Sequence, residues 1–132
     1  IDGIRFVNDS KGTNPDSSIK AVEAIKGDII LIAGGYDKGS DFDALIKSFD
    51  GKVKAMVLLG KTAPKIKETS EKLGFTDIRM AKDMDECVKI AYSIAAPGDT
   101  VLLSPACASW DMYTCFEQRG EHFKNLVHKL AN

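Results

Sequence analysis

The sequence predicts a three-layer, Rossmann-like α/β domain whose mostly parallel sheet is covered by helices on both faces. Short apolar runs of strand length alternate with amphipathic segments of helical length along the chain. One of these runs, Asp28–Ala33, is continuously apolar after its first residue, which is typical of a strand buried on both faces. Strands that alternate with helices are joined by the crossover connections that parallel neighbours require.

The first strand is expected over Ile4–Val7, followed by the polar loop 8–14 and a helix. Asn14 suits the N-cap because its side chain accepts a hydrogen bond from the first turn. Pro15 suits the first helical position, where no amide hydrogen is needed. Gly27 is placed to end this helix. Its apolar stripe is formed by Ile19, Val22 and Ile25.

The middle of the chain repeats the alternation after the buried strand 28–33. The glycine-rich loop Gly34–Gly39 precedes a short helix, and the strand Val53–Leu59 precedes a longer helix that Gly74 ends. A weaker, outer strand is expected over Phe75–Met80. The residues expected to point inward from these two helices are Phe42, Leu45, Ile46, Phe49, Ala63, Ile66 and Leu73.

The last third contains a capping box, in which Asp83 caps a helix and Glu86 stands three residues later. The last strand is expected over Thr100–Leu103, and the loop 104–114 leads to a C-terminal helix. The residues expected to point inward from these two helices are Met84, Cys87, Val88, Ala91, Ala95, Phe116, Phe123, Val127 and Leu130.

Composition restricts the function. The 132 residues suit one domain, with 44% apolar and 28% charged residues. A net charge of −1 gives no positive field for a nucleic acid. No apolar run approaches the ~20 residues that a membrane helix needs, and no signal peptide is recognisable. Because the chain opens on Ile1 rather than Met, we expect a segment of a larger soluble protein.

The cysteines and histidines predict no metal site. Cys87, Cys107 and Cys115 are odd in number and form no CxxC pair, which favours reduced thiols that pack as small apolar residues. His122 and His128 are six residues apart on the expected helix, so they do not share a face as a metal pair would. Both are expected at the surface.

The expected fold brings three loops together. Ligands of such sheets bind beyond the carboxyl ends of the strands, where the loops 8–14, 34–39 and 104–114 follow their strands. This collection suits an anionic small molecule that carries a carboxylate or a phosphate. The side chains expected at the rim are Lys11, Lys38, Ser10, Thr13, Ser104 and Ser109.

The segment Ala55–Thr62 satisfies the loose P-loop pattern but is not predicted to be one. A P-loop needs its four variable residues in a loop whose amides surround the phosphate. Here those residues are Met-Val-Leu-Leu, which form the predicted strand itself.

Four segments resemble a known family: 8–14 (NDSKGTN), Gly34–Phe42 (GGYDKGSDF), Leu103–Asp111 (LSPACASWD) and Phe116–Phe123 (FEQRGEHF). Their order and spacing, from about residue 3 to residue 130, are similar to those of the C-terminal domain of the Mur ligases. Within that family the resemblance is to the members that add D-glutamate to UDP-N-acetylmuramoyl-L-alanine.

The resemblance implies a three-domain, cytoplasmic and monomeric enzyme of peptidoglycan synthesis. The first domain would hold the UDP-sugar, the second the P-loop, ATP and Mg²⁺, and this third domain the amino acid. ATP would phosphorylate the terminal carboxylate of UDP-N-acetylmuramoyl-L-alanine, and the amine of D-glutamate would displace phosphate from that acyl phosphate, leaving ADP. Because such a site forms between domains by closure, this chain alone is expected to bind weakly and to catalyse nothing.

The resemblance also implies roles for six residues. Lys11 and Lys38 would be the catalytic residues, and Lys38 would pair with the carboxylates of D-glutamate. Lys11 would neutralise phosphate charge as the acyl phosphate forms. The amino acid would be bound by Thr13, Lys38, Ser109 and the backbone amide of Phe116, and the nucleotide by Asp9 and Lys11. A dianion needs a cation and several fixed donors to offset its desolvation.

Simpler interpretations stay open for several of these residues. Lys38 suits a solvated loop lysine, Ser109 an N-cap, and Asp9 a turn-forming residue. Trp110 and Tyr113 are expected only to pack or to line the cleft. Two other functions also stay open: a different ligase of the same superfamily, such as a folylpolyglutamate ligase, and a free-standing α/β module that binds a nucleotide or an acidic metabolite.

Overall fold

The computed structural model describes residues 3–35, 41–107, 113 and 115–130. In that part of the chain, all strands are parallel and lie in the order β1-β5-β2-β3-β4. The elements are β1 (Arg5–Asn8), α1 (Pro15–Ala24), β2 (Ile29–Ala33), α2 (Asp43–Lys47), β3 (Val53–Leu58), α3 (Ala63–Lys72), β4 (Ile78–Met80), α4 (Met84–Ile94), β5 (Thr100–Leu103) and α5 (Phe116–Leu130).

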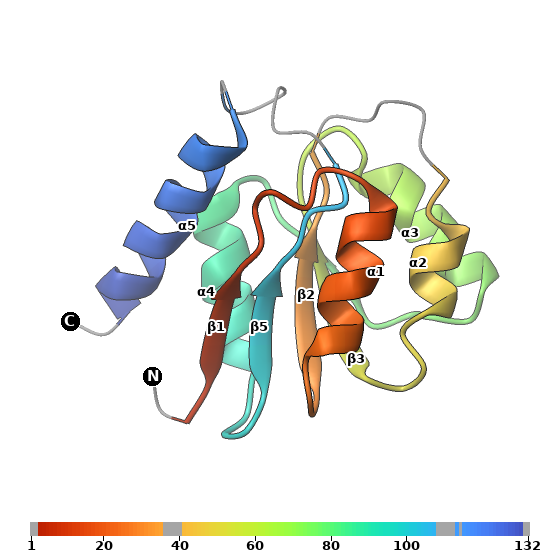
Figure 1. Ribbon diagram of the computed structural model, residues 1–132, viewed down its shortest axis with the longest axis horizontal. Coiled ribbons are helices and arrows are strands. Elements are labelled where there is room, and N and C mark those ends of the chain that lie inside the picture. The colour runs from red at the N-terminus through yellow and green to blue at the C-terminus, as the bar shows by residue number, and fades with distance from the viewer. Residues whose placement is uncertain (1–2, 36–40, 108–112, 114, 131–132) are drawn as a thin grey trace.

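Helices cover both faces of the sheet, which confirms the predicted three layers (Figure 1). One apolar cluster joins α1, α2 and α3 to one face, and a second joins α4 and α5 to the other. The connection from β1 to β2 passes over β5, and the chain returns from the edge strand β4 to the centre through α4. The predicted outer strand is therefore an edge strand, although only three of its expected residues are paired.

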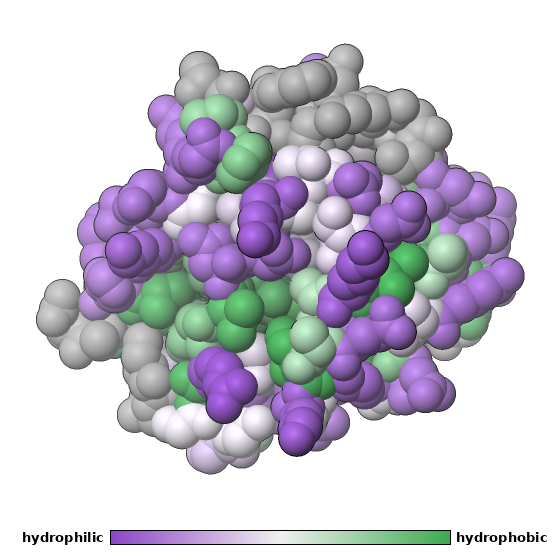
Figure 2. Space-filling model, viewed as in Figure 1, coloured by the Kyte–Doolittle hydropathy of each residue, from purple (hydrophilic) through white to green (hydrophobic). Residues whose placement is uncertain are grey.

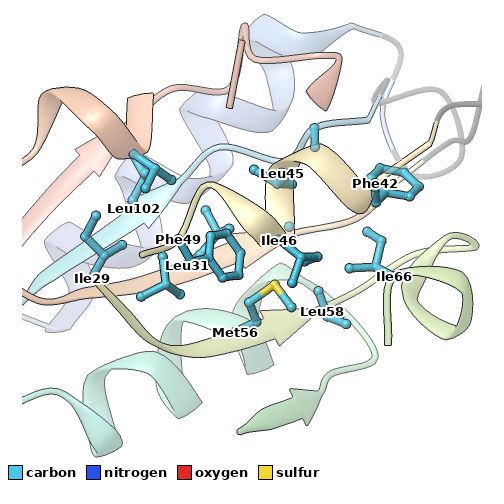
Figure 3. Packing of buried hydrophobic residues seen from close by; sticks show 14 of the residues in the cluster. Ile29, Leu31, Phe42, Leu45, Ile46, Phe49, Met56, Leu58, Ile66 and Leu102 are labelled. Atoms are coloured by element: carbon cyan, nitrogen blue, oxygen red, sulfur yellow. The ribbon is translucent and has the colours of Figure 1, made fainter. Parts of the chain in front are cut away.

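The central strand β2 shows why the sheet is buried on both sides. All five of its residues are buried. Ile29 and Leu31 face the cluster under α1 to α3, whereas Ile30 and Ile32 face α4 and α5. Figure 3 shows the first cluster, in which side chains of the strands meet those of α2 and α3. Its labelled members are Ile29, Leu31, Phe42, Leu45, Ile46, Phe49, Met56, Leu58, Ile66 and Leu102.

Local signals start the helices as predicted. The side chain of Asn14 accepts a hydrogen bond from the amide of Ser17 (2.9 Å), and Pro15 opens α1. The side chain of Asp83 accepts one from the amide of Glu86 (2.8 Å) at the start of α4. Gly74, with φ of +88°, follows the C-cap of α3. Helix α1 ends at Ala24, earlier than the predicted stop at Gly27.

Two residues predicted to point inward are exposed instead. Leu73 is 39% exposed and Phe116 is 40% exposed. Leu73 is the C-cap of α3, past its last turn. Phe116 is the first residue of α5 and lies beside the loop after β1, not over the sheet. The inward stripe of α5 consists of Arg119, Gly120, Phe123 and Leu126.

The surface gives no sign of a membrane span among the described helices, because none of them is long and apolar enough to cross a bilayer. Hydrophilic side chains dominate the face shown in Figure 2, and apolar surface remains between them where β1 and β5 lie. Val7 of β1 is one of the half-buried apolar residues that pack against the core there.

A carboxylate links the amino-terminal ends of β5 and β3. Asp99, directly before β5, accepts hydrogen bonds from the side chain of Lys54 and from the amide of Ala96 (2.8 Å). Lys54 belongs to β3, so this contact spans β2. Burial alone would raise the pKa of Asp99, but the two hydrogen bonds and the charge of Lys54 hold it below its ordinary value of 3.8.

The pH dependence of stability tests this contact. Because the folded pKa of Asp99 is lower than the unfolded one, the unfolded chain binds more protons in acid, so stability falls as the pH falls, from about pH 5 downward. We expect Asp99→Asn to flatten that dependence, measured as the urea midpoint at pH 7, 4 and 3. Asp77→Asn, at an exposed ion pair, is the control. If the urea midpoint fell equally with pH in wild type and Asp99→Asn, the stabilising role of the Asp99 carboxylate would be contradicted.

Candidate functional site

Three loops meet at the carboxyl ends of β1, β5 and β2, which are neighbours in the sheet. The amide of Asp9 donates to the carbonyl of Leu103 (2.7 Å), that of Ala106 to Gly12 (2.9 Å), and that of Gly34 to Pro105 (2.9 Å). The segment after β5 therefore holds both of the other loops through backbone hydrogen bonds. The prediction that these loops come together is confirmed for the described residues.

A buried arginine, Arg119 of α5, joins two of these loops. It is 2% exposed. Its Nε donates to the hydroxyl of Ser10 (3.0 Å), one terminal nitrogen to the carbonyl of Ser10 (2.6 Å), and the other to the carbonyl of Cys107 (3.0 Å). The Ser10 hydroxyl in turn donates to the carbonyl of Phe116 (2.6 Å). The planar fork of a guanidinium suits such divergent acceptors.

Sequence reasoning assigned no role to Arg119. A signal was present, because Arg119 stands three residues after Phe116 and four before Phe123, both predicted to point inward from this helix. A charged residue at such a position indicates a buried polar contact.

The loop after β1 is held by a second polar cluster. The hydroxyl of Ser104 donates to the carboxylate of Asp9 (2.7 Å). The hydroxyl of Ser18 lies 2.9 Å from the Ser104 hydroxyl and donates to the carbonyl of Ser104 (3.1 Å). The prediction that Ser104 lines the rim is therefore wrong, whereas Ser10 does line one of the hollows at this end of the sheet. Both are buried, and their hydroxyls are used within the protein.

Two backbone positions make this close approach possible. A Cβ on Gly12 would lie 2.7 Å from the carboxylate of Asp9 and 2.9 Å from the hydroxyl of Ser104, so any side chain there would displace these hydrogen-bonded groups. Ala106 adopts φ of +62°, a left-handed conformation that is uncommon for a residue with a side chain. The hydrogen bond of its amide to Gly12 and its burial offset that strain.

The structure places four of the predicted site residues as follows. Lys11 is exposed and lines two adjoining hollows. One, of about 390 Å³, is also lined by Asp9, and the other, of about 310 Å³, by Phe116. Thr13 is half-buried, lines neither hollow, and donates its amide to the carbonyl of Lys11 (2.8 Å). Lys11 therefore lies beside both Asp9, which the resemblance assigns to the nucleotide, and Phe116, whose amide it assigns to the amino acid.

Lys38 and Ser109 lie outside the described residues, as does Trp110. The backbone that leads to Lys38 is described up to Gly35. Gly34 has φ of +112°, and a Cβ there would lie 2.0 Å from the carbonyl oxygen of Leu59. Gly34 is thus required where this loop crosses the end of β3.

The remaining predictions concern thiols, histidines and the P-loop pattern. All three cysteines are free, and Cys87 and Cys107 are buried as expected. Burial raises the pKa of the Cys87 thiol, which makes it unreactive. His122 and His128 are exposed, and Nδ1 of His122 lies 2.7 Å from the hydroxyl of Tyr113.

In the segment that mimics a P-loop, 55–62, three of the four variable residues (Met56, Val57 and Leu58) belong to β3 (Val53–Leu58), so the prediction that it is not a P-loop is confirmed. Among the residues that the structure describes, no group of three or more His, Cys, Asp or Glu could hold a metal ion.

Comparison with known proteins identifies the family of this site. Residues 1–107 match the family described as "Mur ligase, glutamate ligase domain". The chain belongs to this family. It is 63% identical over 130 residues to UDP-N-acetylmuramoylalanine--D-glutamate ligase of Alkaliphilus oremlandii, covering 98% of the chain and 29% of that protein. It is 56% identical to the same-named ligase of Clostridioides difficile, with the same coverage.

Solved structures show the same fold at low identity. UDP-N-acetylmuramate-alanine ligase from Thermotoga maritima matches with a TM-score of 0.57 and 12% identity, over 88% of this chain and 25% of that one. Folylpolyglutamate synthase from Mycobacterium tuberculosis matches with a TM-score of 0.54 and 12% identity, over 72% and 26%. The Mur ligase domain thus spans about 29% of the length of its curated relatives.

The stability of this Mur ligase domain should depend on Arg119. Replacement by Met keeps much of the stem but leaves the carbonyls of Ser10 and Cys107 without their donor, so we expect a loss of about 2–4 kcal/mol. Arg79→Met, at an exposed ion pair, should change stability by less than about 0.5 kcal/mol. Urea unfolding of wild type, Arg119→Met and Arg79→Met measures both effects. Equal stability of the two variants would contradict the stabilising role of Arg119.

Proposed function

We propose that this chain is the C-terminal, amino-acid-binding domain of a three-domain, ATP-dependent ligase that adds D-glutamate to UDP-N-acetylmuramoyl-L-alanine in peptidoglycan synthesis. The observation that carries the proposal is the 52–63% identity of nearly the whole chain to proteins named as that ligase. The loops that the resemblance singled out are also those that converge at the carboxyl ends of β1, β5 and β2, where ligands of such sheets bind.

The proposed reaction has two steps. The terminal carboxylate of UDP-N-acetylmuramoyl-L-alanine takes the γ-phosphoryl group of ATP, which gives an acyl phosphate and ADP. The amine of D-glutamate, as its free base, then attacks the acyl carbon, and the resulting tetrahedral intermediate loses phosphate and a proton to give the amide. Because the nucleophile is an amine, the contribution of this domain is chiefly to hold it in line, an effect worth several kcal/mol in favourable cases.

Lys38, Thr13, Ser109 and the Phe116 amide are the proposed contacts of D-glutamate. The placement of Phe116 supports the proposal, because the first amides of a helix have no acceptor within it and favour an anion. The ring of Phe116 is exposed beside Lys11, so an anion at this amide would lie next to a cation. The carboxylates of D-glutamate suit such a site.

Lys11 and Asp9 are the proposed residues at the nucleotide side. Lys11 is exposed and shares a hollow with Asp9 and Lys20, which suits the charge of a phosphate group. The Asp9 carboxylate is fixed by Ser104, so its remaining acceptor positions are pre-oriented toward a donor such as a ribose hydroxyl. ATP and Mg²⁺ are assigned to the preceding domain of the ligase, and Lys11 would neutralise charge on the transferred phosphoryl group.

The proposal also covers the setting of the enzyme. We expect a cytoplasmic monomer whose partners are ATP, D-glutamate and the UDP-linked substrate, with neither a nucleic acid nor a membrane as a binding partner. The net charge of −1 argues against a nucleic-acid partner, and the face shown in Figure 2 is predominantly hydrophilic.

Phosphate release tests the function. We expect the full-length protein, given ATP, Mg²⁺ and UDP-N-acetylmuramoyl-L-alanine, to release phosphate when D-glutamate is added and far less with L-glutamate. The isolated chain should release none, because the site needs the other domains. Release that depends on another amino acid would transfer the proposal to a different ligase of the superfamily. Turnover by the isolated chain would contradict the domain assignment.

Replacement of Lys38 tests the amino-acid site. We expect Lys38→Ala in the full-length protein to lower kcat/KM for D-glutamate by at least about a hundredfold, because a buried dianion loses its cation. Lys26→Ala, at an exposed lysine after α1, should leave the kinetics unchanged. Circular dichroism checks that both variants fold. Wild-type kinetics of Lys38→Ala at limiting D-glutamate would refute the role.

A further inference from the structure

Thr62 is a buried polar residue that the proposed function does not use. It follows β3 and directly precedes α3, and it is 2% exposed. It is also the last residue of the segment 55–62, whose sequence mimics a P-loop. In a true P-loop this hydroxyl would reach a bound metal ion. In this protein the hydroxyl of Thr62 is buried, and its hydrogen-bond partners indicate a structural role.

The partners of Thr62 on one side are both backbone groups of Gly35. The amide of Gly35 donates to Oγ1 of Thr62 (2.9 Å), and the hydroxyl donates back to the carbonyl of Gly35 (3.1 Å). The amide of Thr62 reaches the same carbonyl (3.2 Å). Gly35 stands three residues before Lys38 in the sequence. Thr62 therefore fixes the first part of the loop that carries Lys38.

On the other side, Oγ1 of Thr62 lies 3.3 Å from the sulfur of Cys107. Cys107 stands two residues before Ser109, and its carbonyl accepts a hydrogen bond from Arg119. One hydroxyl thus contacts both the segment that leads to Lys38 and the segment that leads to Ser109.

We infer that Thr62 is a positioning residue that holds Gly35 and Cys107, the described ends of the segments that lead to Lys38 and Ser109, at a fixed separation. The inference rests on the proposed function, in which Lys38 and Ser109 bind the same D-glutamate. A ligand held from two loops loses affinity when either loop shifts, since the donors then no longer meet it together. Without the hydroxyl, the buried amide of Gly35 loses its acceptor, so that loop must move to satisfy it.

Kinetics of the full-length protein test the inference. Thr62→Val removes the hydroxyl with little change of shape, and Thr62→Ser keeps it. Ser70→Ala is the matched control, because it removes a buried hydroxyl of α3 that donates to the carbonyl of Ile66 (2.8 Å) within the same helix. We expect Thr62→Val to raise KM for D-glutamate about three- to tenfold, with KM for ATP unchanged. Thr62→Ser and Ser70→Ala should resemble wild type.

Thiol labelling separates a local effect from general destabilisation. Cys107 and Cys87 are both buried, but they belong to the clusters on opposite faces of the sheet. We expect iodoacetamide to label Cys107 faster in Thr62→Val than in wild type, with Cys87 unchanged, as followed by mass spectrometry. Equal acceleration at both cysteines, or an unchanged KM for D-glutamate, overturns the inference.

The failure of the proposed function would look different. In that case wild type would release no phosphate in response to D-glutamate. Selective labelling of Cys107 in Thr62→Val would then still support the role of Thr62 in holding the two loops, and unchanged labelling would overturn it.

Discussion

The arrangement of the site depends on one buried guanidinium. Arg119 reaches Ser10 from α5 with two of its nitrogens and Cys107 with a third. A buried guanidinium must be hydrogen-bonded to offset the loss of water, so the loops that supply its acceptors are held in one geometry. The backbone bonds of Ala106 to Gly12 and of Gly34 to Pro105 extend that geometry to the third loop.

The polar residues in and around these loops fall into two groups. The buried hydroxyls, Ser10, Ser18, Thr62 and Ser104, bind other parts of the protein. Lys11 remains exposed between two hollows. A rigid base with an exposed cation favours the binding of an anion in the proposed function, because little ordering of the protein is then needed.

The errors of sequence reasoning occurred where a residue's environment depends on distant segments. Phe116 has the helical spacing of Phe123, but it begins α5 beside the loops and is exposed. Ser104 follows a buried strand and was expected at the rim, yet its hydroxyl is taken by Asp9, 95 residues away in sequence. Periodicity indicates which side of an element a residue occupies, and it does not show where the element lies over the sheet.

The sequence by itself determined the alternation of strands and helices, the caps at Asn14 and Asp83, and the doubly buried β2, because these depend on neighbours within a few residues. Its motifs also identified the family. Only the tertiary structure decided which groups Arg119 would bind and that Thr62 would lie between Gly35 and Cys107. Those contacts join residues 12 to 109 positions apart. Such pairings follow from the order of the strands, which no local pattern specifies.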